Sequence, residues 1–214
     1  MIKEIILNYI KALKELGRTD FEVVINKDWL EIDDDIEIIY CGDNPGKTEK
    51  EQKKYFVGNA GNELELFIKV HNKRLGKSKN TFFNKTPCHS IKTKDITKTK
   101  DLNKVVYTSI KLTIDCFAKI YEIKQIPIIV FGSDESSYIV KSFKEILNDE
   151  KYSTLKASLT ILNHPSYNSL FATFGKCLIS KFENKDEIHL TYSDLLNKTK
   201  KKWREKSEYK QLCN

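Results

Sequence analysis

The chain has 214 residues, of which 40% are hydrophobic and 31% charged, which is typical of a folded soluble protein and excludes a disordered or fibrous one. No apolar run approaches the length of a membrane span, and the first residues lack the continuous apolar stretch of a signal peptide, so we expect one domain over 1–214 in the cytoplasm. The net charge of +7 favours polyanionic partners, although a generally lysine-rich composition explains it equally well.

The predicted elements begin with an amphipathic helix. Charges alternate with Ile and Leu at helical spacing, and this helix should end at Gly17, within a helical segment over residues 1–30. Four β-rich runs follow it in chain order, at Ile36–Cys41, Thr81–Asn84, Ile126–Phe131 and Leu159–Asn163. Helical patterns occupy the intervals between or after them, at Asn62–Lys73, Leu102–Tyr121, Glu135–Leu147 and, as a charged helix or tail, residues 185–214.

This alternation of apolar strands with helices indicates a parallel sheet that is covered on both faces. We therefore expect the α/β class, as a three-layer α/β/α sandwich with a central, mainly parallel four-stranded sheet. Ligands of such sheets bind where the carboxyl ends of the strands meet. The loops at that edge are the candidates for a site: GDNPG from residue 42, NKTPCHS from 84, GSDESS from 132 and NHPSYNS from 163.

The first of these loops combines backbone freedom with two polar side chains. Gly42 and Gly46 let the chain turn sharply out of a strand and bring its backbone close to a ligand. Asp43 can accept a proton or orient a water, whereas Asn44 can only orient one. An ordinary turn closed by a side-chain hydrogen bond accounts for the same residues.

Two further motifs carry side chains suited to binding. The aromatic Phe56, followed by Gly-Asn-Ala-Gly, is a candidate surface for stacking a flat ring, or else an apolar contact at a helix start. His164 follows a strand and precedes a proline, so its imidazole is placed to donate a hydrogen bond to a developing anion, or to play a structural part. Ser166 can hold a phosphate.

Residues 90–104 form a lysine-rich segment in which Lys-Thr-Lys-Asp occurs twice. We expect a basic, exposed loop there. The composition of this loop is consistent with contact with phosphates and equally with a solvated connection.

Together these motifs resemble the uracil-DNA glycosylase superfamily, and most closely its iron–sulfur branch, family 4. The ungapped block over 42–61 is similar to that branch's motif G-E-x-P-G-x-x-E-D-x-x-G-x-P-F-V-G-x-A-G, through Gly42, Pro45, Gly46, Glu49, Phe56, Val57, Gly58, Ala60 and Gly61. TFFNKTPC, IPIIVFGSDESS and NHPSYNSL resemble the segments that follow in the same order, so the resemblance covers about residues 36–171.

The resemblance implies an enzyme of base excision repair that acts on DNA containing uracil or a related deaminated base. Such an enzyme flips the nucleotide out of the stack and hydrolyses its N-glycosidic bond. Phe56 would stack on the base, Asn84 would hydrogen-bond its edge beside Gly42, and His164 would donate to the departing base. The residues expected at the DNA phosphates are Ser166, Gly46 and Ser133.

Two neighbouring residues, Asp43 and Asn44, are candidates for positioning the water. The iron–sulfur branch has Glu at the position of Asp43, whereas other branches have Asn at the position of Asn44. Neighbours in an extended segment point to opposite sides, so one of the two should face the sugar. The position that lines the pocket in several branches favours Asn44.

The chain departs from the pattern of the iron–sulfur branch at its cysteines. The iron–sulfur branch uses four cysteine ligands, and only Cys88 and Cys116 match them in this chain, which has no CxxC pair. We therefore expect no iron–sulfur cluster and no metal, with the N-terminal helix packing in that place.

Base specificity and activity are left open as well. Gly46 stands where a common form of the motif has a bulky Tyr that excludes thymine. A member that binds nucleic acid or nucleotides without cleavage, and a hydrolase of small nucleosides, are alternatives to the glycosylase. We expect a monomer without a membrane partner.

Overall fold

The computed structural model describes residues 1–16, 22–58, 60–65, 68, 79–90, 100–162 and 164–165. Its helices are α1 (Ile2–Leu16), α2 (Lys47–Gln52), α4 (Lys100–Ile123), α5 (Tyr138–Leu147) and α6 (Ser153–Ser158), with short 3-10 helices η1 (Lys27–Glu31) and η3 (Glu150–Tyr152). Its strands are β1 (Ile38–Gly42), β2 (Asn80–Asn84), β3 (Ile128–Phe131) and β4 (Leu159–Leu162). Residues 60–65 are also helical. The C-terminal segment 185–214 and most of the basic loop 90–104 lie outside the described residues.

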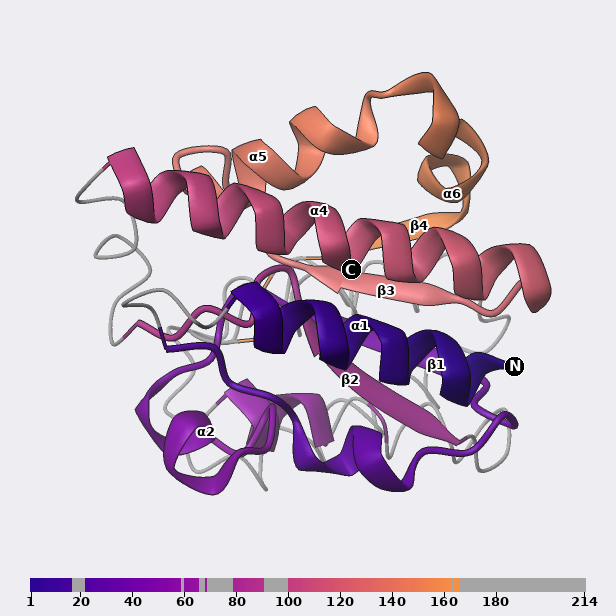
Figure 1. Ribbon diagram of the computed structural model, residues 1–214, viewed down its shortest axis with the longest axis horizontal. Coiled ribbons are helices and arrows are strands. Elements are labelled where there is room, and N and C mark those ends of the chain that lie inside the picture. Colours follow the sequence, from indigo (N-terminus) through magenta and orange to yellow (C-terminus); the bar gives the residue numbers. More distant parts are fainter. Residues whose placement is uncertain are drawn as a thin grey trace, which may run out of the picture.

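The strands form one parallel sheet in the order β2-β1-β3-β4 (Figure 1). The predicted α/β class and four-stranded sheet are thus confirmed, and every pair of strands is parallel. Gly42 lies opposite Asn84 in the register, so β1 and β2 end side by side. The chain runs from β1 outward to β2 and then returns across β1 to β3. The loops after β1 and β3 therefore diverge, and parallel sheets bind their ligands at such a switch point.

One face of the sheet is covered by α1, α4 and α5, and α1 lies alongside α4 (Figure 1). The apolar sides of α1 and α4 bury Leu13 and Phe117 against inward-facing strand residues such as Ile39. Because strand side chains alternate, the neighbouring Tyr40 belongs to the opposite face. There it packs with Leu64 of the helical residues 60–65, so helices cover both faces within the described part of the chain.

Four short helices were not predicted, namely α2, η1, η3 and α6, and the first two show why. Helix α2 has six residues, too few for an apolar periodicity, and forms because the Glu49 carboxylate accepts a hydrogen bond from Gly46 N at 2.7 Å. The 3-10 helix η1 begins where the Asn26 side chain accepts from Asp28 N. In both cases a side chain binds free backbone N–H groups, an interaction that hydrophobic patterning does not reveal.

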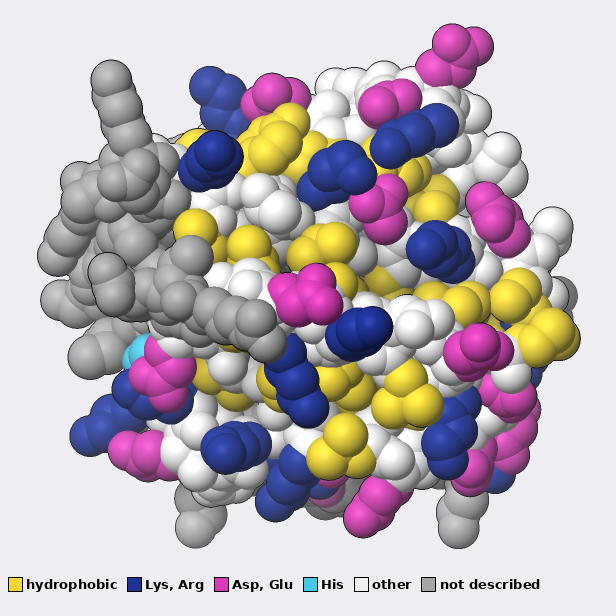
Figure 2. Space-filling view, viewed as in Figure 1, with side chains coloured by type: hydrophobic (Ala, Val, Ile, Leu, Met, Phe, Trp, Pro, Cys, Tyr) yellow, Lys and Arg dark blue, Asp and Glu magenta, His cyan; other side chains and the backbone are white. Residues whose placement is uncertain are grey.

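The surface over α1 and α4 carries no field of a single sign. Figure 2 shows Lys and Arg side chains interspersed with Asp and Glu, with hydrophobic groups between them. Pairs such as Lys111–Asp115, at 2.8 Å, account for part of this mixture. Within the described ranges, no helix has both the length and the apolar character needed to cross a bilayer.

The docking of α1 can be tested with two leucines of the same helix. Leu13 is fully buried, whereas Leu7 is 43% exposed. Leu13→Ala should lower the free energy of unfolding by about 2–5 kcal/mol because it removes buried contacts and leaves a cavity. Leu7→Ala should change it by less than about 0.5 kcal/mol. Urea denaturation measures both, and equal losses would contradict this packing of α1.

Candidate active site

A buried ion pair joins the carboxyl ends of three strands. Lys85 Nζ lies 2.6 Å from Asp43 Oδ1 and also donates to the backbone oxygen of Phe131. Asp43 follows β1, Lys85 follows β2, and Phe131 ends β3. The Lys85 side chain is 1% exposed and that of Asp43 is 19% exposed. A buried charge requires such a partner, so the pair determines how these strand ends are arranged.

Gly132 leaves room for this pair at the switch point between β1 and β3. Its φ is +89°, a conformation that suits glycine, and a Cβ atom there would lie 2.6 Å from Asp43 Oδ1. Its N–H donates to Leu162 O at 2.9 Å, which continues the contact of β3 with β4. Any larger residue would displace the Asp43 carboxylate.

His164, which lies just beyond β4, faces the same charges. Burial lowers the pKa of His164; the charge of Asp43 raises this pKa and that of Lys85 lowers it. The lowered pKa keeps the ring neutral at physiological pH, so that one ring nitrogen carries a proton and the other does not.

A second group of side chains meets at Gly42. A Cβ atom at Gly42 would lie 2.5 Å from Asn84 Oδ1 and 2.8 Å from Phe56 Cζ, so glycine is needed for this approach. Asn84 is 3% exposed, and none of the described residues accepts a hydrogen bond from its Nδ2. A buried amide donor without a partner is costly. It is therefore available to a ligand beside the Phe56 ring.

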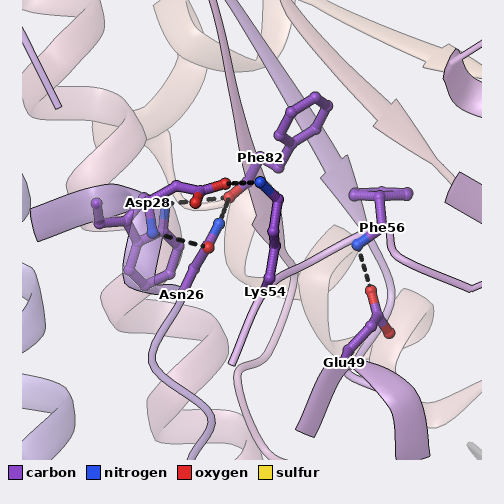
Figure 3. A network of polar contacts seen from close by, with 7 residues as sticks. Asn26, Asp28, Glu49, Lys54, Phe56 and Phe82 are labelled. Atoms are coloured by element: carbon purple, nitrogen blue, oxygen red, sulfur yellow. Dashed lines mark hydrogen bonds and ion pairs between the residues drawn. The ribbon is translucent and has the colours of Figure 1, made fainter. Parts of the chain in front are cut away.

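The backbone of Phe56 is held in an uncommon conformation. Its φ is +55°, in the left-handed region that bulky residues avoid, so the surrounding structure must maintain it. Glu49 does so with both oxygens: Oε1 accepts from Phe56 N at 2.5 Å (Figure 3), and Oε2 accepts from Gly46 N at 2.7 Å. Burial raises the pKa of Glu49, while the two N–H donors lower it. One carboxylate thus joins the two halves of the glycine-rich loop.

The segment before Phe56 is anchored to β2. Asn26 and Trp29 both donate side-chain N–H groups to Phe82 O, at 3.2 and 3.0 Å. Lys54 pairs with Asp28 at 3.1 Å, so the turn that leads to Phe56 is attached to the same network (Figure 3). These contacts position the aromatic residue from a part of the chain that no motif had indicated.

The other predicted residues have different surroundings. The Asn44 side-chain amide donates to the carbonyl oxygens of Pro45 and Ser90, at 3.3 and 3.4 Å. Gly46 contributes its N–H to Glu49, and Ser133 is exposed at the start of the loop after β3. Ser166 lies outside the described residues.

The structure therefore forms two groups from the predicted site. Asp43, paired with Lys85, interacts electrostatically with His164, and Phe56 meets Asn84 at Gly42. Sequence reasoning missed Lys85, which looked like one more lysine of a basic chain. A glycine directly after a strand at the switch point was a usable signal for Gly132.

Three of the five cysteines lie in the described part of the chain. Cys41, Cys88 and Cys116 are buried thiols, and burial raises the pKa of Cys41 to about 12 and also raises those of the other two. Burial of this kind favours the protonated thiol, which packs as a small apolar side chain. Tyr9 of α1 is buried within electrostatic range of all three and bonds Thr113 at 2.8 Å. The described part of the chain also has no cluster of three or more His, Cys, Asp or Glu side chains that could hold a metal.

Comparison with protein families matches residues 31–186 to the Uracil DNA glycosylase superfamily. The chain belongs to this superfamily. The match spans the ion pair, the Phe56 loop and His164, whereas Asn26 and Trp29, which anchor that loop, lie before it. It supports a glycosylase-like hydrolase that acts on DNA, in general terms. No individual curated protein matches the chain significantly.

Two glycines of the loop test the placement of Phe56. A Cβ atom at Gly61 would overlap the Phe56 carbonyl group, whereas one at Gly58 would meet open space. Gly61→Ala should therefore lower the free energy of unfolding by about 1–3 kcal/mol. Gly58→Ala should leave it within about 0.5 kcal/mol of the wild-type value. Thermal and urea unfolding measure both variants, and a neutral Gly61→Ala would show that the helix does not approach Phe56 so closely.

The burial of His164 predicts a dependence of stability on pH. Its pKa is lowered in the folded state, so the unfolded chain takes up this proton first as the pH falls below about 6.5. The wild type should lose more free energy of unfolding between pH 7.5 and pH 5 than His164→Gln, which lacks the titrating group. Urea denaturation at both pH values gives the comparison. Equal losses would mean that the imidazole is solvated.

Proposed function

We propose that the protein is a DNA glycosylase that hydrolyses the N-glycosidic bond of uracil, or of a related deaminated base, after flipping the nucleotide out of the stack. The observation that carries this proposal is the buried Asn84 amide beside Phe56, on the same sheet edge as Asp43 and His164. Membership of the superfamily supports the reaction class. The base and the roles of individual residues are part of the proposal.

The base would be recognised by stacking and by one amide. Flipping costs a few kcal/mol, which contacts with the extruded base must offset. Phe56 supplies an aromatic ring, and Asn84 supplies a donor and an acceptor side by side. The edge of uracil presents a carbonyl oxygen next to an N–H group, which pairs with these two atoms. A flat pyrimidine therefore suits the site.

Cleavage would be assisted by charge at both ends of the breaking bond. As the bond from C1′ to the base breaks, its electron pair moves to the base and positive charge develops on the sugar. The neutral imidazole of His164 would donate its N–H to the oxygen that becomes negative. The Asp43 carboxylate would stabilise the sugar cation and orient a water, whose oxygen bonds to C1′ and whose proton is released.

The two candidates for handling the water are not equivalent in this arrangement. Asp43 shares its surroundings with His164, whereas Asn44 is directed at the carbonyl oxygens of Pro45 and Ser90. We therefore assign the water to Asp43, in place of the preference for Asn44 that motif position suggested. Gly46, Ser133 and Ser166 remain the proposed contacts to DNA phosphates.

The decisive experiment is a base-release assay. Purified protein, without added metal, should generate abasic sites in uracil-containing single- or double-stranded oligonucleotides. Asn84→Ala and His164→Ala should each lower the rate by about 100-fold or more, since each removes a polar contact to the base in the transition state. Asn80→Ala changes the same residue type at the other end of β2 and should leave the rate unchanged.

Substrate controls separate this proposal from its alternatives. Oligonucleotides with a G·T mismatch or with other deaminated bases define the range of bases released. Salt-sensitive DNA binding without release of any base would indicate a member that only binds. Activity on free deoxyuridine but not on DNA would indicate a nucleoside hydrolase.

A second comparison tests the assignment of the water. Asp43→Asn should lower the rate of uracil release by about 100-fold or more because the amide carries no negative charge. Asn44→Ala should lower it by less than about tenfold, because it removes hydrogen bonds to loop carbonyl oxygens and no negative charge. Single-turnover kinetics on the same oligonucleotide measures both. A larger loss of rate in Asn44→Ala than in Asp43→Asn would assign the positioning of the water to Asn44 instead.

A further inference from the structure

We infer that Lys85 is a positioning residue of the proposed reaction: it holds one oxygen of the Asp43 carboxylate so that the other oxygen faces the attacking water. This inference rests on the proposed function. It assigns a part to a residue that no motif singled out and that the proposed chemistry does not otherwise use.

The contacts of Lys85 leave it no access to a substrate. Its ammonium group has three N–H donors, one directed to Asp43 Oδ1 and one to Phe131 O. Its Nζ also lies 5.8 Å from the centre of the Phe143 ring, on the side of α5. With a side chain that is 1% exposed, Lys85 lies beneath Asp43. Any effect on the reaction must pass through the carboxylate.

The two oxygens of Asp43 have different surroundings. Lys85 binds Oδ1, whereas no residue in the described ranges donates a hydrogen bond to Oδ2. A Cβ atom built on Gly132 would lie 2.6 Å from Oδ1 and 3.0 Å from Oδ2, so the carboxylate is packed against the backbone of this glycine. The Asp43 side chain is 19% exposed, and the inference assigns the contact with water to Oδ2 because Lys85 occupies Oδ1.

The charge of Lys85 also suits the chemistry. A negative charge at a partly buried strand end is stabilised by a nearby cation, and the Lys85 ammonium lies 2.6 Å from Asp43 Oδ1.

Attack of Lys85 on the sugar does not fit this geometry. An imine at C1′ would require a neutral amine that reaches the substrate, and this amine is buried with two oxygen acceptors. Borohydride reduction would trap such an imine on DNA, so the two roles can be distinguished directly.

The test is a double-mutant comparison of uracil release. Lys85→Met should lower kcat by about 100-fold with KM within about threefold, because the loss is in water positioning rather than DNA binding. The Lys85→Met/Asp43→Asn protein should match Asp43→Asn within about threefold, because Lys85 acts only through Asp43. Lys124→Met is the matched control: Lys124 Nζ also donates to a backbone oxygen, that of Ile36, and its loss should leave kcat unchanged.

Circular dichroism and urea unfolding confirm that each variant is folded. If Lys85→Met fails to fold, the comparison of the double variant with Asp43→Asn tests the inference instead. The double variant should fold because it buries no unpaired charge. A kcat near the wild-type value in Lys85→Met would overturn the inference, as would multiplied losses in the double variant or a borohydride-trapped adduct that depends on Lys85. If the wild type releases no base, the proposed function itself fails, so the two failures are separable.

Discussion

The arrangement of the candidate site depends on one buried ammonium group. Lys85 Nζ binds the residue after β1 and the last residue of β3, while its own backbone N–H donates to Gly42 O at 2.8 Å. The ends of three adjacent parallel strands are therefore held around one charge. That charge requires a carboxylate, and Asp43 provides it at the switch point of the sheet. The position of the proposed water follows from this requirement.

The part of the candidate site around Phe56 depends on a second carboxylate, that of Glu49. Glu49 binds the backbone of Gly46 and of Phe56, and so connects the turn after β1 to the aromatic residue ten positions beyond the turn's end. The left-handed conformation of Phe56 and the close approach of Gly61 are consequences of the same tight packing. The glycine-rich loop therefore has two parts, one beside the ion pair and one that presents an aromatic ring.

The strands and long helices were predictable because burial imposes a regular pattern on them. The runs that became β1 and β3 are apolar on both faces, and the buried side of α4 recurs at helical spacing. The short helices α2 and η1 depend on single hydrogen bonds to backbone N–H groups, which leave no periodic signal. Among the site residues, Gly42, Phe56, Asn84 and His164 were found from loops at the carboxyl edge and from the family motif.

What the sequence determined by itself was the class of fold, the edge of the sheet that carries the site and the family to which the chain belongs. Those properties follow from local patterning and from the order of motifs along the chain. Only the tertiary structure showed that Asp43 pairs with a buried Lys85, while Asn44 donates to carbonyl oxygens of the loops. The physical reason is that the sequence alone does not distinguish a solvated lysine from a lysine that is buried in an ion pair. Its burial depends on a carboxylate 42 residues away, brought within 2.6 Å by the parallel register of β1 and β2.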